Sequence, residues 1–347
     1  MKIIVDVMGG DKAPLETVKG AIAALREWND LELILVGNRA EIEKIAGEEG
    51  FDLSSVEIVH TDGVITMEDD PMCVTRAKKD SSMALGLRML ADGRGDAFVS
   101  TGNTGALFTG GTLIVRKVKG VQRAGIGTVM PFQTPVLLLD SGANVTVVPE
   151  NLEQFAMIGS VYMKKMFEIE RPRVGLLNNG SEACKGTEVQ QTAYKLLSEQ
   201  KDVHFVGNIE GSVLPFDCCD VIVTDGFLGN IMLKSSEGVL KLMLKKLKAM
   251  FKGPTGILAY LLLKSKLRGL KKQFDPAEIG GAPILGLSKP VIKAHGSSDA
   301  KAFKNAIRQA ADYAASGALD EIAAAAAAWS ARKKAEKQAA DSANEAT

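Results

Sequence analysis

Five segments of the chain combine glycines with small polar side chains and a few charged ones. They span residues 6–11, 100–106, 178–186, 224–230 and 293–298, and each follows a short apolar run that predicts a strand. Glycines let backbone N–H groups approach an anion, and the start of a following helix adds partial positive charge. A single turn of this kind is better explained by capping and positive φ. Five of them expected at one edge of a sheet favour a site for an anion.

Short β-branched runs alternate with segments of helical period, a pattern typical of a parallel sheet covered on both faces. The sequence therefore predicts a doubly wound, three-layer α/β/α fold with a mostly parallel sheet. We expect strands at 2–7, 31–36, 56–60, 96–100, 126–130, 136–140, 173–178, 203–206, 220–224 and 291–294. We expect helices at 15–28, 39–49, 73–91, 104–118, 151–167, 187–199 and 300–315.

The domain organisation follows from where this alternation stops. No linker rich in glycine or proline divides the chain, so residues 1–318 are expected to form a single catalytic domain. Within it, residues 233–272 predict a protruding helical hairpin, broken at Gly253-Pro254. Residues 319–347 begin with an alanine-rich run and end in a polar tail, which we expect to be frayed or disordered.

Composition excludes several classes of function. Lys plus Arg and Asp plus Glu number 42 each, so a general nucleic-acid binder is not expected. Four cysteines without zinc spacing and three histidines argue against a metal site. Neither GxxxxGK[ST] nor GxGxxG occurs, which argues against a P-loop ATPase and a Rossmann dehydrogenase. The apolar run at 257–263 is too short to span a membrane. Because the chain opens on MKIIVDV without a leader, we expect a cytoplasmic protein.

The five segments, taken in order, resemble those of the phosphate acyltransferase family of bacterial phospholipid synthesis (the PlsX family). The motifs are IVDVMGGDKAP, STGNTGAL, LLNNGSE followed by KG, VTDGFLGN and VIKAHGSSD, and they reach to about residue 316. The resemblance implies a homodimer of the phosphotransacetylase and isopropylmalate dehydrogenase fold group. It also implies transfer of an acyl group from acyl carrier protein to phosphate, without a cofactor. The acyl phosphate would feed a membrane glycerol-phosphate acyltransferase.

Two other enzyme classes share this fold. Decarboxylating dehydrogenases hold their metal with aspartates on the helix after the strand that matches VIVTDG, but that helix here has Asn230 and no Asp, although Mg²⁺ prefers carboxylates. A phosphotransacetylase acting on acyl-CoA is chemically nearer, and the residues alone leave it open. A scaffold at the membrane with an inert body is the non-enzyme alternative, and it has no use for five polar strand-end loops.

The chemistry requires two anionic partners to be positioned and an oxyanion to be stabilised. We assign Gly102, Asn103, Thr104 and Gly105 to the phosphate, as a nest at a helix start. Lys185 is our candidate for neutralising phosphate or oxyanion, and His295 for donating to the leaving sulfur or the oxyanion. Asp225 and Asp6 could orient a donor or cap a helix. The further candidates for binding phosphate or acyl donor are Gly9, Gly10, Asp11, Gly226, Asn230, Gly296 and Ser297.

The predicted hairpin is strongly basic. Between Lys241 and Lys272 it carries ten Lys or Arg and no Asp or Glu. In its first helix an apolar face is expected from Leu240, Met243, Leu244, Leu247, Met250 and Phe251, flanked by Lys241, Lys245, Lys248 and Lys252. It could pack in a dimer interface, dock acyl carrier protein, or lie on anionic lipid with Leu258 and Leu261 in the bilayer. The excess of positive charge makes packing in a dimer interface the weakest of these interpretations. Docking of carrier protein and binding to lipid are compatible with each other.

Overall fold

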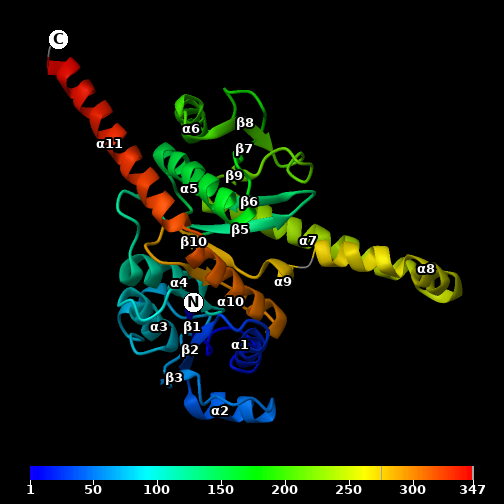
Figure 1. The fold of residues 1–347 in the computed structure, drawn as a ribbon. Helices are drawn as coiled ribbons and strands as arrows, with labels where there is room; N and C mark the ends of the chain where they lie inside the picture. The colour runs from blue at the N-terminus through cyan, green and yellow to red at the C-terminus, as the bar shows by residue number, and fades with distance from the viewer. Residues whose placement is uncertain (275, 346–347) are drawn as a thin grey trace.

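The protein is built on one eleven-stranded sheet with helices on both faces (Figure 1). The computed structural model describes residues 1–274 and 276–345. The strand order is β3-β2-β1-β4-β11-β10-β5-β6-β9-β7-β8. The strands are β1 (Lys2–Asp6), β2 (Glu32–Gly37), β3 (Glu57–His60), β4 (Ala97–Ser100), β5 (Gly125–Pro131), β6 (Pro135–Leu139), β7 (Arg173–Asn178), β8 (His204–Glu210), β9 (Val221–Val223), β10 (Ala282–Leu285) and β11 (Val291–Lys293).

Eleven α-helices and two short helical turns connect the strands in the described part of the chain. They are α1 (Leu15–Glu27), α2 (Arg39–Glu48), η1 (Pro71–Thr75), α3 (Ser82–Ala91), α4 (Thr104–Gly110), η2 (Gly111–Val115), α5 (Pro149–Phe167), α6 (Glu188–Glu199), α7 (Gly226–Met250), α8 (Gly253–Gln273), α9 (Pro276–Ile279), α10 (Ala300–Ala315) and α11 (Ala318–Glu345). Side-chain oxygens cap several of them where the sequence has Asn, Ser or Asp, as at Asn38, Ser81 and Asp299.

The core is divided between the two faces of the sheet. On one face α1, α5 and α10 pack around Phe155 and Phe303. On the other face α3 and α4 cover the half that holds β1 and β4, while the start of α7 covers the half that holds β6 and β9. Ile126 and Met130 of β5 join these last two clusters and point to the same side of the strand. Helices α4 and α7 therefore cover the same face, on opposite sides of β5.

The strands reverse direction in the middle of the sheet. Strands β3, β2, β1, β4 and β11 run parallel, β10 is antiparallel to both β11 and β5, and β5 is antiparallel to β6. Strands β6, β9, β7 and β8 are parallel to one another, and so run opposite to the first group. The expectation that all five polar loops share one edge is therefore wrong: three lie at one edge and two at the other. The direction changes between β5 and β6, which pair as an antiparallel hairpin. Strand β10, which the sequence prediction missed, is antiparallel to both of its neighbours and so leaves β11 and β5 running in the same direction.

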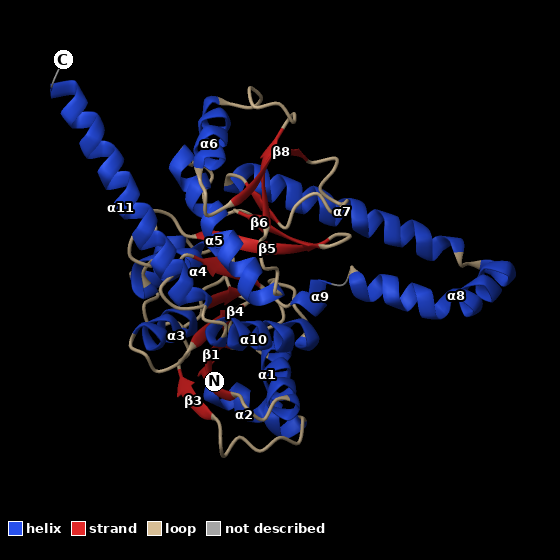
Figure 2. Cartoon of the chain, turned by 45° about the horizontal axis from the view of Figure 1, so that its top comes forward, coloured by secondary structure: helices blue, strands red, loops and turns tan. Residues whose placement is uncertain are grey.

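The hairpin is confirmed as α7 and α8, which extend away from the body (Figures 1 and 2). None of the described helices is long and apolar enough to cross a membrane. Leu240, Leu244, Leu247 and Phe251 are half-buried as expected, but Met243 and Met250 are exposed. A second apolar stripe therefore lies on the solvent side of α7, formed by Phe227, Ile231, Val239, Leu242, Met243 and Met250.

The C-terminal segment also differs from the expectation of a frayed or disordered tail. Residues up to Glu345 form α11, and its first turns are held on the body by Ile322 and Trp329, which are buried. Arg332 and Lys333 pair with the buried carboxylate of Glu153 on α5 at 2.5 and 3.2 Å. Alanine has the highest helix propensity, so the alanine-rich run forms a helix once this one face is packed.

Candidate functional site

Three of the polar loops meet at the carboxyl ends of β1, β4 and β11. Asp11 donates its backbone N–H to the carbonyl of Gly296 at 2.9 Å, and the Thr101 hydroxyl donates to the carbonyl of Gly9. A side chain at Gly9 would lie 2.7 Å from the Cα of Gly102, and one at Gly10 would lie 2.6 Å from the Thr101 hydroxyl. Gly10 also has a positive φ of 99°. Close packing between loops thus accounts for both glycines.

Asp6 holds this junction together from beneath. Its carboxylate is 1% exposed and accepts hydrogen bonds from the hydroxyls of Ser82 and Ser100 at 2.6 and 2.7 Å, and from Met8 N at 3.1 Å. Burial raises the pKa of Asp6, and the two hydroxyls oppose that rise. Since the carboxylate is enclosed, Asp6 positions the loops and does not face the outside of the site.

A buried lysine lies beside this junction. Lys293, the last residue of β11, is 8% exposed, and its ammonium donates to the carbonyls of Thr101, at 3.3 Å, and Ala294. Within residues 1–274 and 276–345 it forms no ion pair. Burial lowers the pKa of Lys293 to about 8, against the charges of Asp11 and Asp6, which raise it. The sequence analysis missed this residue, although a lysine ending an otherwise apolar buried strand is rare enough to be a signal.

His295 lies two residues further on and is exposed. Its Nδ1 accepts the backbone N–H of Ser297 at 3.2 Å and lies 2.9 Å from the Ser297 hydroxyl. The proton of the neutral ring therefore sits on Nε2, which is free to donate. Burial, followed by the charges of Lys234 and Lys293, lowers the pKa of His295. The imidazole is consequently neutral near pH 7, with Ser297 fixing its tautomer.

The start of α4 faces the same junction. Asn103 caps the helix by accepting from Ala106 N at 3.0 Å, and its amide donates to the carbonyls of Thr66, Met67 and Asp69 at 3.1–3.2 Å. The hydrogen-bonding groups of the Asn103 side chain are therefore occupied by other parts of the protein. Thr104 is exposed, whereas Gly105 packs against Pro71, which a side chain would meet at 2.7 Å. The backbone N–H groups of Thr104 and Gly105 donate no hydrogen bond to any residue that the structure describes. These two donors and Gly102, whose N–H bonds to Ser100, line the loop.

The remaining candidates lie at the other edge of the sheet. Lys185 is exposed in the loop after β7, and its carbonyl accepts from the Asn178 amide at 3.1 Å. Asp225 caps α7 by accepting from Leu228 N at 2.9 Å, and Asn230 is exposed beside Gly142. Gly226 is pressed against the backbone of residues 143–144, which leaves no room for a side chain. A single chain thus does not bring these four residues to His295 and Lys293.

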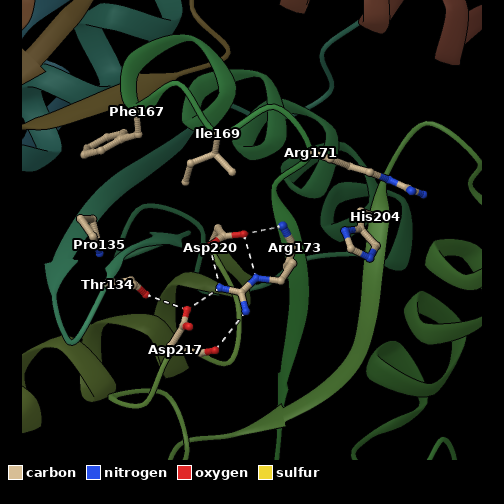
Figure 3. A pocket seen from close by; sticks show the side chains of 9 residues that line it. All are labelled: Thr134, Pro135, Phe167, Ile169, Arg171, Arg173, His204, Asp217 and Asp220. Carbon is tan, nitrogen blue, oxygen red and sulfur yellow. Dashed lines mark hydrogen bonds and ion pairs between the residues drawn. The ribbon is translucent and has the colours of Figure 1, made fainter.

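A recess in the surface is separate from both loop clusters. This recess, about 550 Å³ in volume, is one of those found in the described residues and lies at the amino ends of β6, β7 and β9 (Figure 3). Arg173 there is paired with Asp217 and Asp220 at 2.6 and 2.9 Å, so its charge is satisfied. Its other walls include Pro135, Phe167 and Ile169, with Arg171 and His204 at one side. The recess holds none of the predicted site residues.

No group of three or more His, Cys, Asp or Glu side chains that could hold a metal ion is found in the part of the chain that the structure describes. The polar groups at the first junction are backbone N–H groups, hydroxyls, an ammonium and an imidazole. Such donors suit an anionic ligand better than a hard cation, which prefers oxygen ligands.

Solved structures with the same fold are enzymes of two kinds. A phosphotransacetylase from Streptococcus pyogenes superposes with a TM-score of 0.59 at 19% identity, covering 90% of this chain and 94% of its own. A 4-hydroxythreonine-4-phosphate dehydrogenase from Burkholderia phymatum gives a TM-score of 0.50 at 16% identity, covering 90% and 97%. These likenesses confirm the predicted fold group.

Sequence relatives are more specific. The family described as "Fatty acid synthesis protein" matches residues 1–320. The phosphate acyltransferase of Acetivibrio thermocellus is 44% identical over 324 residues, which are 93% of this chain and 95% of that protein. The phosphate acyltransferase of Clostridioides difficile is 41% identical over 325 residues, again 93% and 95%. The chain therefore belongs to the fatty acid synthesis protein family, the family of these phosphate acyltransferases.

Proposed function

We propose that the protein transfers a fatty acyl group from acyl carrier protein to inorganic phosphate and releases acyl phosphate for phospholipid synthesis. A phosphate oxygen attacks the thioester carbonyl, the C–S bond breaks, and the proton of hydrogen phosphate ends on the departing sulfur. Acyl-CoA is the alternative donor, since both donors present the same thioester. No covalent acyl-enzyme is required, and no cofactor or metal takes part.

One observation carries the proposal: a buried lysine without an ion pair lies next to unpaired N–H groups at a helix start. Phosphate bound between Lys293 and the N–H groups of Thr104 and Gly105 would pair with the ammonium charge and accept hydrogen bonds from the N–H groups. Helix α4 continues into η2, so the helical run behind these donors extends from Thr104 to Val115. Bound phosphate would also offset the cost of burying the Lys293 ammonium.

His295 completes this arrangement. Its Nε2–H can donate to the carbonyl oxygen as that oxygen becomes an oxyanion, or to the leaving sulfur. A neutral imidazole suits either role, because it donates without adding a counter-charge that would hold the phosphate back from attack. Asp11 and Gly296 shape the loop that carries it, through the hydrogen bond between their backbones.

Roles for Lys185, Asp225, Gly226 and Asn230 in catalysis require a homodimer. Since these residues lie at the opposite edge of the sheet in one chain, they can reach the phosphate only if a second copy presents them. The exposed apolar stripe of α7 supports such a pairing, because a row of six large side chains in water is unfavourable. A dimer of this kind would place Lys185 near the oxyanion.

The basic hairpin is proposed to serve carrier protein and membrane. Its lysines Lys241, Lys245, Lys248 and Lys252 are all exposed, and can meet an acidic carrier. Near the tip, Leu258 and Leu261 are each 61% exposed, and can enter the interface of an anionic bilayer. We therefore propose a cytoplasmic enzyme attached to the inner face of the membrane, next to the glycerol-phosphate acyltransferase that consumes its product.

The activity is tested with purified protein, phosphate, and palmitoyl-carrier protein or palmitoyl-CoA side by side. Acyl phosphate is trapped with hydroxylamine and the hydroxamate is measured. We expect phosphate-dependent hydroxamate with the carrier protein at a higher kcat/KM than with CoA. Hydroxamate at a higher kcat/KM with CoA would make the chain a phosphotransacetylase, and none with either donor would leave the scaffold alternative.

The hairpin is tested by two double variants. Lys245→Glu with Lys248→Glu should lower kcat/KM for acyl carrier protein and make it less dependent on salt. Leu258→Ser with Leu261→Ser should release the protein from phosphatidylglycerol vesicles in sedimentation while turnover of soluble substrate stays unchanged. If the lysine reversals act only on vesicle binding, by about 1 kcal/mol per cation, the lysines bind lipid and not the carrier.

A further inference from the structure

Helix α7 brings a second cation to the phosphate site from across the sheet. It begins at the carboxyl end of β9 and covers the same face as α4, but the two halves of the sheet run in opposite directions. Leu228, Met232 and Leu233 hold its first turns on the sheet. The eight steps along the helix from Gly226 to Lys234 rise by about 12 Å, most of the length of a five-residue strand. Lys234 thus reaches the level at which α4 begins.

The electrostatics of the site agree with this path. The charge of Lys234 acts on both His295 and Lys293, while Glu237 and Lys241, further along α7, act on His295 with opposite signs. In the described chain, Lys234 pairs with Glu237 on its own helix, at 3.0 and 3.1 Å. Its side chain is half-exposed, so this pair is weak and readily exchanged.

The charges of Lys234 and Lys293 therefore oppose each other, while Asp11 and Asp6 act on Lys293 and Glu237 pairs with Lys234. Such an arrangement is unfavourable when empty and favourable when a dianion lies between the two cations. Glu237 offers Lys234 a partner for as long as no anion is bound.

We infer that Lys234 is a phosphate-binding residue, which leaves Glu237 and closes on the anion held by Lys293 and the start of α4. The inference rests on the proposed function, since it takes phosphate to be the acyl acceptor. The phosphate would then be bound by Lys293 from one side of the sheet's central strands and by Lys234 from the other. Glu237 is a positioning residue, which competes with phosphate for the same ammonium.

Three variants test this. Lys234→Met should raise KM for phosphate at least tenfold, while KM for acyl carrier protein stays within about twofold. Lys234→Arg keeps the charge and should recover most of the loss. Glu237→Gln removes the competitor and should lower KM for phosphate. Lys44→Met, an exposed lysine on α2 far from the site, is the matched control and should behave as the wild type.

A second readout does not depend on turnover. Inorganic phosphate, titrated without acyl donor, should raise the melting temperature of the wild type and of Lys44→Met, but raise that of Lys234→Met much less. Chloride at equal ionic strength controls for salt. Equal stabilisation of Lys234→Met by phosphate, or a KM change confined to the acyl donor, would overturn the inference. If the wild type neither binds phosphate nor uses it, the proposed function itself fails.

Discussion

The loops at the two edges of the sheet are built from the same residue types but differ in how their polar groups are satisfied. At the second edge, the buried carboxylate of Asp140 accepts hydrogen bonds from Ile126, Gly142, Ala143 and Asn144 N–H groups at 2.7–3.1 Å, and Asp225 caps α7. Both of these carboxylates have structural partners. At the first edge, the buried ammonium of Lys293 donates to two carbonyls and has no ion pair among the residues that the structure describes.

This difference shows which feature separates a structural loop from a binding loop. Glycine, asparagine and aspartate occur at both edges because strand-to-helix turns need them. A buried cation without a carboxylate is costly, and therefore indicates a ligand. The comparison predicts that phosphate binds at the first edge, and that the loops at the second edge contribute only through another chain, whereas Lys234 reaches the site along α7 of the same chain.

The largest effect is expected for Lys293→Met. Removing the ammonium should lower kcat/KM for phosphate by about 100-fold or more, because a buried charge-assisted contact to a dianion is lost. The folded state should keep its stability or gain some, since a desolvated charge is replaced by an apolar side chain of similar length. Kinetics and denaturant unfolding measure the two quantities. A variant with wild-type phosphate kinetics would remove the distinction between the edges.

Mixing of subunits shows whether the second edge acts in trans. Lys185→Met alone should reduce activity more than tenfold, because the oxyanion loses a cation. Mixing Lys185→Met with Lys293→Met should restore roughly a quarter to a half of the wild-type activity, since a mixed dimer contains one site with neither substitution. Activity that stays low after subunit exchange would show that the two lysines serve a site within one chain. Full activity of Lys185→Met would make that lysine a surface residue.

A pH profile tests the state of Lys293. Its pKa is lowered to about 8, so the ammonium is present below that pH and is lost as pH rises through it. KM for phosphate should therefore increase above pH 8, by up to about tenfold per unit. Lys293→Arg, which stays charged, should show a flatter profile. The prediction fails if the wild-type KM is constant between pH 7 and pH 9.5.

The smallest effect is expected at Asp225. Replacing this N-cap by alanine should lower the free energy of unfolding by about 1 kcal/mol, whereas serine, which also caps, should preserve it. If Asp225 only caps, Asp225→Ser keeps its activity. An inactive but stable Asp225→Ser variant would give the carboxylate a role in catalysis, and would place it with Lys185 in a site shared between chains.

The sequence predicted the fold group and ten of the eleven strands, because apolar runs and helical period are local signals. It did not predict the direction reversal, which depends on the antiparallel pairing of β5 with β6, and it missed β10, four residues with no distinguishing period. That reversal separated Lys185 and Asp225 from Asp6 and His295. The pattern of α7 was equally ambiguous, because Met243 and Met250 fit an apolar face by spacing but are exposed.

For the site, motifs identified the loops but not the role of each residue. Asn103 was assigned to the phosphate, yet its amide holds the carbonyls of the 66–69 loop, a partner 34–37 positions away that no local pattern reveals. Lys293 was overlooked because its importance comes from burial, which a sequence does not display. Lys234 lacks any motif of its own, and only the path of α7 brings it to the site.

The most direct test is a crystal structure of the protein at saturating inorganic phosphate. Our account predicts one phosphate within hydrogen-bonding distance of Lys293 Nζ and the N–H groups of Thr104 and Gly105, with Lys234 turned from Glu237 toward it. Phosphate bound instead in the Lys185 loop of the same chain, or in the recess beside Arg171 and His204, with the first edge empty, would contradict it.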